Sequence, residues 1–295
     1  MSDSDPESTT RAIFHTDGDR LVPTGLARGP WYTGTQHGSA MLGLLARAVD
    51  RHTASQPMQV ARLTVDLSRA APLAPVTTHT QTVHRGRSVD TVEARIEADG
   101  ETFARAVALR FRVQEIDVSG DPSSRAAAQF ALPPANARLE LPSFGADDEA
   151  FYRSLEIRLP IGTEAPAMWF RLTCPFVAGE ATSPLVTTAA LADWAYSVPF
   201  LLAMRGDPAS ARRDRGFTTI NPDTSINLHR PMTGEWLCLE SQVQHAGRGA
   251  GSSLALLHDQ AGRIGHASQS ILIRGPDKRP ILQDEAGQKR GSDGS

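Results

Sequence analysis

The alternation of apolar and polar residues is clearest near the C-terminal end of the chain, across residues 217–274. Gln269, Ile271 and Ile273 share one face of a predicted strand, and the residues between them share the other face. Just before it, residues 259–262 read Asp-Gln-Ala-Gly, which suits a tight connection between antiparallel strands. The pattern predicts a strand, a turn, a long strand, a glycine-rich loop and a final hairpin.

Residues 60–112 carry the same order of elements, which predicts an internal duplication. Here too a strand, a short proline-containing connection, a second strand, a loop and a hairpin follow one another. When Gly100 is aligned with Gly262, Arg112 falls on Arg274. Two copies with so long a period indicate a duplicated domain and not a solenoid.

An apolar helix is predicted in front of each copy. The first covers residues 39–52, behind Gln36, His37 and Gly38, and its apolar residues extend most of the way round, as expected of a buried helix. The second begins at Ser183-Pro184, because serine is a favoured N-cap and proline suits the first helical position.

The second predicted helix carries a carboxylate on its apolar side. Leu185, Ala189 and Asp193 recur at a spacing of four residues and share one face. A buried polar group needs a partner, so Asp193 and Gln269 are candidates for chemistry. The alternatives are a structural ion pair for Asp193 and a solvent-facing position for Gln269.

The elements predict an α+β protein in which each copy packs one long helix against an antiparallel sheet of roughly five strands. The two sheets are expected to join into one continuous sheet with both helices buried. The expected organisation, in chain order, is an N-terminal tail at 1–10, a first domain at 11–116, a linker at 117–150, a second domain at 151–275 and a polar tail at 276–295.

Composition excludes several classes of protein. A net charge of -3 gives no electrostatic reason to expect nucleic-acid binding. Cys174 and Cys238 form no zinc spacing or disulfide framework, and no metal or cofactor motif is present. The start of the chain is acidic and polar, and no apolar run was identified that approaches a membrane span of about 20 residues. We expect a cytoplasmic protein.

Several segments resemble the double-hotdog acyl-CoA thioesterases of the type II class, found in bacteria and peroxisomes. The resemblance covers nearly the whole chain except its tails and linker. The segments that carry it are residues 31–48, Leu191-Ala192-Asp193, His229-Arg230-Pro231 with Glu235-Trp236-Leu237, residues 246–249, and residues 267–274. It implies a tandem (double) hotdog fold and hydrolysis of acyl-CoA to a free fatty acid and coenzyme A.

The resemblance also implies a site. In that family an Asp on the second helix, a Ser or Thr on the next strand and a late Gln hold the attacking water. These positions fall on Asp193, Asn221 and Gln269, so an amide replaces the hydroxyl. Asn can still hydrogen-bond a water. Asn221 before a proline also suits a turn, and Thr219 or Asp223 would replace it if the register slipped.

Two further parts of a thioesterase site have candidates. His37 and Gly38 at the start of the first helix could present amide donors to an oxyanion, or Gly38 could serve only close packing. Arg87 and Arg248, in two glycine-containing loops, could contact the phosphates of coenzyme A, or the loops could simply be solvated.

Two other functions stay open. A hotdog enoyl-CoA hydratase or dehydratase would need an Asp/His pair, and none is predicted because His37 and Asp193 lie in different copies. A silent acyl-CoA-binding protein is suggested by the amide at Asn221. The resemblance also implies a homo-oligomer.

Overall fold

The computed structural model describes residues 11–29, 34–121, 131–141, 149–160, 165–204 and 216–275. Its helical segments are η1 (Gly25–Ala27), α1 (Gly38–Arg51), η2 (Ala135–Ala137), η3 (Phe151–Ser154), α2 (Pro184–Ala192), η4 (Asp193–Ser197) and α3 (Val198–Met204), where η denotes a 3₁₀ helix. Its strands are β1 (Phe14–Asp17), β2 (Arg20–Pro23), β3 (Met58–Leu67), β4 (Thr77–Arg85), β5 (Val89–Ala98), β6 (Glu101–Arg112), β7 (Leu155–Arg158), β8 (Ala167–Leu172), β9 (Thr218–Ile220), β10 (Asp223–Leu228), β11 (Leu237–His245), β12 (Ala250–Asp259) and β13 (Gly262–Arg274).

One 11-stranded antiparallel sheet holds most of the strands, in the order β4-β5-β6-β3-β10-β13-β12-β11-β8-β7, with β9 on β13. The order is mirrored about the central pair β3 and β10, because β3 to β6 belong to the first predicted copy and β10 to β13 to the second. The copies therefore do join into one continuous sheet, as the sequence predicted. Both predicted hairpins are present, with left-handed φ angles at Asp99 and Gly100 in one and at Gly262 in the other.

The seam between the copies is an antiparallel ladder in which Ser225 lies opposite Thr64 and Asp223 opposite Asp66. The hydroxyls of Thr64 and Ser225 hydrogen-bond at 2.8 Å. Because the seam pairs two interior strands, neither copy presents an open edge at the centre of the sheet.

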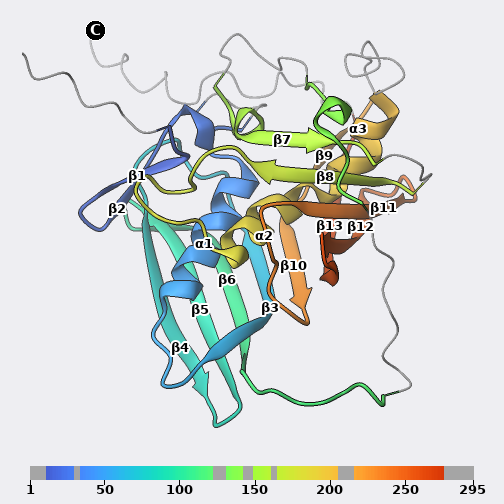
Figure 1. The fold of residues 1–295 in the computed structure, drawn as a ribbon. Helices are drawn as coiled ribbons and strands as arrows, with labels where there is room; N and C mark the ends of the chain where they lie inside the picture. The colour runs from blue at the N-terminus through green and yellow to red at the C-terminus, as the bar shows by residue number, and fades with distance from the viewer. Residues whose placement is uncertain are drawn as a thin grey trace, which may run out of the picture.

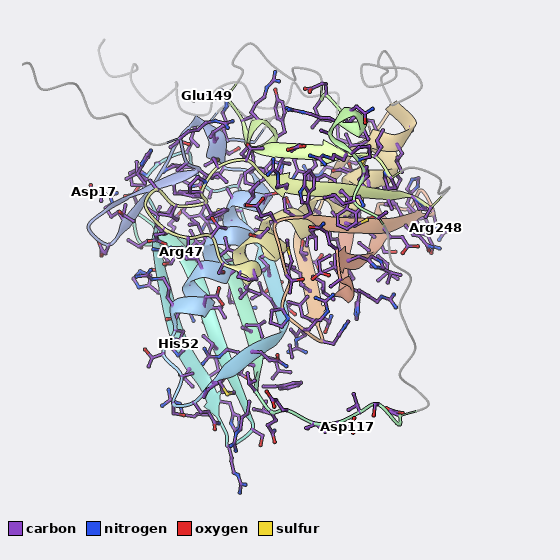
Figure 2. The ribbon with its side chains drawn as sticks, viewed as in Figure 1. Asp17, Arg47, His52, Asp117, Glu149 and Arg248 are labelled. Carbon is purple, nitrogen blue, oxygen red and sulfur yellow. The ribbon has the colours of Figure 1, made fainter. Side chains whose placement is uncertain are left out.

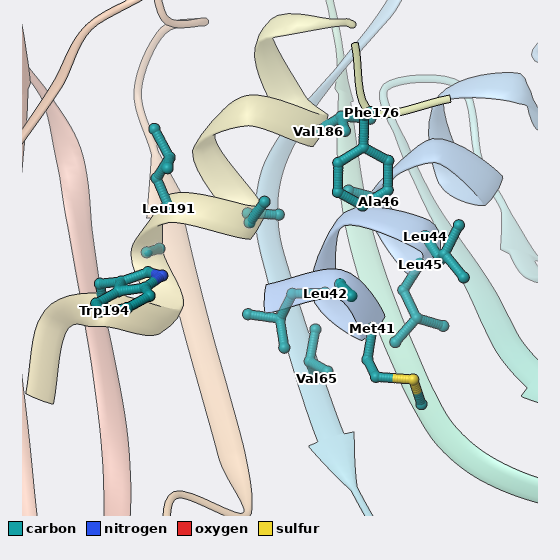
Figure 3. Close-up of a cluster of buried hydrophobic side chains, with 14 of the residues drawn as sticks. Met41, Leu42, Leu44, Leu45, Ala46, Val65, Phe176, Val186, Leu191 and Trp194 are labelled. Carbon is teal, nitrogen blue, oxygen red and sulfur yellow. The ribbon is translucent and has the colours of Figure 1, made fainter. Parts of the chain in front are cut away.

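Helices α1 and α2 lie against each other on one face of the sheet (Figure 1). Helix α1 contacts the strands of the first copy, β3 to β6, whereas α2 contacts β8, β10 and β11 of the second. Their contact forms the core shown in Figure 3, where Leu42, Leu45 and Val65 of the first copy pack near Val186 and Leu191 of the second.

The second helical segment differs from the long helix that the sequence predicted. It is a nine-residue α-helix, α2, that tightens into η4 at Asp193 before α3 begins. The physical reason is a side chain inserted into the helical ladder. The amide of Tyr196 donates to Gln269 Oε1 at 3.0 Å, and Gln269 Nε2 donates to the carbonyl of Asp193 at 3.1 Å. An inserted side chain of this kind is a recognised cause of a break in a helix.

The helical run Pro184–Ala203 is long and apolar enough to cross a membrane by length and composition, with a mean hydropathy of 1.3. This differs from the sequence analysis, which had identified no apolar run of that length. Buried residues make up 61% of the window, and a buried core helix meets the same criteria, so the run is weak evidence for a membrane segment.

The His-Arg-Pro segment has a structural role at the last hairpin. Arg230 donates to both carboxylate oxygens of Asp259, at 2.5 and 2.7 Å, and the amide and hydroxyl of Thr233 donate to the same group. Burial alone would raise the pKa of Asp259, but these hydrogen bonds outweigh it and lower the pKa to about 2. The pair therefore fixes the β12–β13 connection, which leads into the strand that carries Gln269.

Gly43 lies where α1 meets the ring of Phe176, and a Cβ at this position would overlap that ring. Phe176 is 1% exposed, so the ring has little room to move. Replacing a mid-helix glycine with alanine ordinarily stabilises a helix by roughly 0.5–1 kcal/mol. Here we expect Gly43→Ala to lower the free energy of unfolding by about 1–3 kcal/mol, the usual cost of overpacking.

Urea unfolding of Gly43→Ala beside Arg51→Ala measures this effect. Arg51 lies on the exposed end of the same helix, so its substitution should leave the midpoint almost unchanged. If Gly43→Ala were more stable than the parent protein, the Phe176 ring would not need the space that glycine leaves at position 43.

Candidate active site

Asp193 is the centre of a polar cluster built from both copies. It lies at the junction of α2 and η4, where the helix tightens, and not in the middle of a regular helix as the sequence suggested. Its carboxylate accepts a hydrogen bond from the Asn221 amide nitrogen at 2.7 Å and another from the Ser39 hydroxyl at 2.9 Å. The side chain is 4% exposed.

Gly38 lets the start of α1 approach this carboxylate. A Cβ on Gly38 would lie 2.9 Å from one Asp193 oxygen and 3.0 Å from the other. A side chain at this position would push the helix start away from the carboxylate. The N-terminal end of α1, which carries a partial positive charge, is therefore directed at Asp193.

Gln269 is 2% exposed and makes three hydrogen bonds. Besides its contacts with Tyr196 and the Asp193 carbonyl, its Nε2 donates to the Thr224 hydroxyl at 3.2 Å. Both amide protons are therefore used, and one lone pair of Oε1 is left to accept a further hydrogen bond. The alternative of a solvent-facing Gln269 is excluded.

His37 lies between two aromatic rings beside the cluster. Its ring stacks on Phe151 at a centroid distance of 5.2 Å and on Trp194 at 5.5 Å. The Ser39 amide donates to Nδ1 at 3.0 Å, so the neutral ring carries its proton on Nε2. Burial lowers the pKa of His37, while the Asp193 carboxylate, 3.4 Å from Nδ1, partly opposes that shift.

The residues expected from the sequence are thus brought together in one place. Asp193, Asn221 and Gln269 meet His37 and Gly38 at the boundary between the two copies. The pairing of His37 with Asp193 was not expected, because these residues lie far apart in the sequence. Asn221 is half-buried and His37 is partly exposed, so they form the more open side of the cluster.

The two alternatives to Asn221 do not join the cluster. Asp223 accepts a hydrogen bond from the amide of Ser270 at 2.8 Å. Thr219 lies on the short strand β9 at the C-terminal end of β13. Asn221 itself therefore contacts Asp193, and no shift of the strand register to Thr219 or Asp223 is needed.

Sequence reasoning missed Thr224 and Ser39, both fully buried. Strand alternation could have placed Thr224 on the inner face, since Ile226 two residues later is also buried. The contact of Thr224 with Gln269 depends on the pairing of β10 with β13, and no local sequence pattern specifies that pairing. Ser39 meets Asp193 only because α1 and α2 pack together.

Of the two arginines suggested for phosphate binding, Arg87 lies apart from the cluster. Arg87 follows β4, and its carbonyl accepts a hydrogen bond from Gln56, beyond the C-terminal end of α1. The cluster is at the other end of α1, about 20 Å away for a helix of 14 residues. Arg248 lies in the β11–β12 loop, at the right of Figure 2, whereas His52 beyond the end of α1 lies at the left.

The chemistry available to this cluster follows from its groups. A buried carboxylate held by two donors keeps a free lone pair that can accept a proton from water. Asn221 has an amide oxygen and a second N–H left to hold that water, and Gln269 has one acceptor position. A water-activating site of this kind suits hydrolysis of a reactive carbonyl.

Comparison with solved structures defines the class of protein as one with a hotdog fold. A conserved protein of unknown function with a hot dog fold from Alicyclobacillus acidocaldarius has a TM-score of 0.64 at 16% identity, over 89% of this chain and 96% of that one. An acyl-CoA thioesterase II, TesB2, from Mycobacterium marinum has a TM-score of 0.56 at 20% identity, over 81% and 91%. At these identities the likeness establishes the fold alone.

Family models give the assignment. The acyl-CoA thioesterase N-terminal domain matches residues 27–111, and the acyl-CoA thioesterase C-terminal domain matches residues 122–273. The chain therefore belongs to the acyl-CoA thioesterase family and is a thioester hydrolase. A search of curated protein sequences gave no significant match.

Removing the Gln269 carboxamide should cost stability as well as function. Gln269→Met would leave the Tyr196 amide and the Asp193 carbonyl without their partner, and each buried unpaired group costs about 1–3 kcal/mol. We expect the free energy of unfolding in urea to fall by at least about 2 kcal/mol. Gln244→Met, at an exposed position on β11, is the matched control. Equal stability of the two variants would contradict the role of Gln269 in the helix break.

The pKa of His37 predicts a pH dependence of stability. Because burial favours the neutral ring, the unfolded chain binds a proton at this histidine more readily than the folded protein does. The contribution of His37 is therefore complete above pH of about 6.5 and is lost as pH falls below that value toward the folded pKa.

Melting temperatures from pH 8 to pH 5 measure this dependence in His37→Asn, which keeps a side-chain acceptor at the N-cap. The loss of stability on acidification should be smaller in His37→Asn than in the unaltered protein. His266→Asn, at an exposed position on β13, should keep the original slope. A parallel slope in His37→Asn would show that His37 titrates alike in the folded and unfolded states.

Proposed function

We propose that the protein hydrolyses acyl-CoA thioesters with a water held by Asp193, Asn221 and Gln269. The observation that carries the proposal is the buried Asp193 carboxylate, hydrogen-bonded by Asn221 at 2.7 Å and reached from the partly open side of the cluster. Asp193 accepts a proton from the water as the water attacks the thioester carbonyl. Thiolate is a good leaving group, so the step needs no separate general acid.

Asn221 takes the position that a hydroxyl residue holds in the related enzymes. Its Nδ2 fixes Asp193, and its carbonyl oxygen is placed to accept from the attacking water. The Thr224 hydroxyl accepts a hydrogen bond from Gln269 Nε2 and so holds the orientation of the Gln269 amide. Thr224 is therefore a positioning residue.

The Gly38 amide is the donor that we assign to the developing oxyanion. Of the first amides in α1, that of Ser39 donates to His37 Nδ1, and those of Ala40 and Met41 donate to the His37 carbonyl. Within the described residues the Gly38 amide has no hydrogen-bond partner, and it lies at the positive end of the helix dipole.

One observation favours a second candidate function. His37 Nδ1 lies 3.4 Å from Asp193, which supplies the Asp/His pair that a hotdog enoyl-CoA hydratase or dehydratase requires. Hydration of an enoyl-CoA would use the same acyl-CoA partner. An assay of enoyl-CoA absorbance beside thiol release distinguishes the two reactions, and binding without turnover would indicate a silent acyl-CoA-binding protein.

The finer features of the sequence analysis belong to the same proposal. We propose a tandem hotdog in which α1 and the broken run from α2 to α3 serve as the two central helices, with domain limits at 11–116 and 151–275. A role in fatty acid metabolism, a cytoplasmic location, homo-oligomer formation, the absence of a membrane span and CoA phosphate contacts by Arg87 and Arg248 remain predictions.

Thiol release from short, medium and long acyl-CoAs tests the proposal. Asp193→Asn should lower kcat/KM by at least about 100-fold, the size typical of lost acid–base help, while the protein stays folded. Asp223→Asn is the matched control, because this carboxylate holds a β13 amide and does not face Asp193. Equal activity of the two variants would place the water elsewhere.

A further inference from the structure

Two serine hydroxyls are buried without a hydrogen-bond partner in the part of the chain that the structure describes. They belong to Ser241 on β11 and Ser253 on β12, which are 0% and 2% exposed. A buried unpaired hydroxyl destabilises a folded protein, and folded proteins rarely leave such groups unsatisfied. Two of them on neighbouring strands call for a partner that the chain itself does not supply.

Both hydroxyls lie on the face of the sheet that carries the proposed site. Ser253 is directly opposite Gln269 in the β12–β13 register, so the two side chains share one face with Cβ atoms about 5 Å apart. Ser241 lies opposite Ala255, which places it diagonally from Ser253 at about 7–8 Å. Gln269, Ser253 and Ser241 thus form a polar row across β13, β12 and β11, and Gln269 at one end of it donates to the Asp193 carbonyl.

Small side chains surround this row. Ala255 and Ala267 occupy the adjacent inner positions on β12 and β13, and Gly251 precedes Ser253 on the same face. The segment η4 lies over β11, β12 and β13, and α3 lies over β11. The row therefore runs beneath the same broken helix that positions Asp193.

We propose that Ser253 and Ser241 line the acyl pocket and select an acyl chain that carries a hydroxyl or oxo group. This rests on the proposed thioester hydrolysis, because Gln269 fixes where the thioester lies. With the carbonyl beside Gln269, the acyl chain extends over Ser253 and then Ser241. A polar substituent on the chain satisfies a hydroxyl that an unsubstituted chain would leave unpaired in an apolar environment.

The expected specificity is measured as the ratio of kcat/KM for a hydroxylated acyl-CoA to kcat/KM for the unsubstituted one. Sites that hydrogen-bond a substrate hydroxyl discriminate against the analogue that lacks it, because the protein group is then left unpaired. One neutral hydrogen bond of about 1.4 kcal/mol corresponds to roughly a tenfold preference. The position of the hydroxyl on the preferred substrate shows which serine binds it. Ser253 is expected to contact a hydroxyl on carbons near the thioester, and Ser241 one farther along the chain.

The experiment compares kcat/KM for octanoyl-CoA with those for 3-, 5- and 7-hydroxyoctanoyl-CoA. The unaltered protein should prefer at least one hydroxylated substrate by about tenfold or more. Ser253→Ala or Ser241→Ala should bring the ratio of hydroxylated to unsubstituted substrate down to about one. Ser252→Ala, on the exposed face of the same strand, is the matched control and should keep the preference.

Two outcomes would overturn the inference. One is a preference for octanoyl-CoA by the unaltered protein. The other is a ratio that neither Ser253→Ala nor Ser241→Ala changes, which would mean that water alone satisfies these hydroxyls.

A binding measurement separates failure of the inference from failure of the proposed hydrolysis. If no acyl-CoA is hydrolysed, the proposed function is wrong, and calorimetric binding of free hydroxyoctanoate and octanoate reads the pocket directly. Tighter binding of a hydroxyoctanoate that is lost in Ser253→Ala or Ser241→Ala supports the pocket. Equal affinities for the two acids would overturn it.

Discussion

The insertion of the Gln269 carboxamide into the helix after α2 is the interaction on which the site depends. It satisfies the Tyr196 amide and the Asp193 carbonyl, which a regular helix would pair within its own ladder. The helix tightens at that point and turns the Asp193 carboxylate toward the start of α1. Because Gln269 is a residue of β13, the sheet and the helix are held in a fixed relation at this position.

The duplicated architecture supplies the two sides of this junction. Strands β3 and β10 join the copies, and α1 and α2 lie together on one face of the sheet. His37, Gly38 and Ser39 reach the carboxylate from the first copy, whereas Asp193 comes from the second. Neither copy contains a complete cluster, so the cluster forms only when both copies are present and correctly docked.

The groups that stabilise this junction are also those of the proposed site. The hydrogen bonds that fix Asp193 and Gln269 are buried, so losing one partner leaves another unpaired at a cost of about 1–3 kcal/mol. The Arg230–Asp259 pair likewise stabilises the hairpin that leads into β13. A loss of activity in this region therefore has to be separated from a loss of folding, which a matched control variant does.

The sequence by itself determined the strands, both hairpins, the duplication and the first helix, because periodicity and turn chemistry are local properties of the chain. Resemblance to a family also pointed to Asp193, Asn221 and Gln269, which the structure places close together. Only the tertiary structure decided that the second helix breaks, that His37 meets Asp193, and that Ser39 and Thr224 complete the cluster. These contacts join residues up to 156 positions apart (His37 and Asp193), and their register depends on the packing of α1, α2 and the sheet.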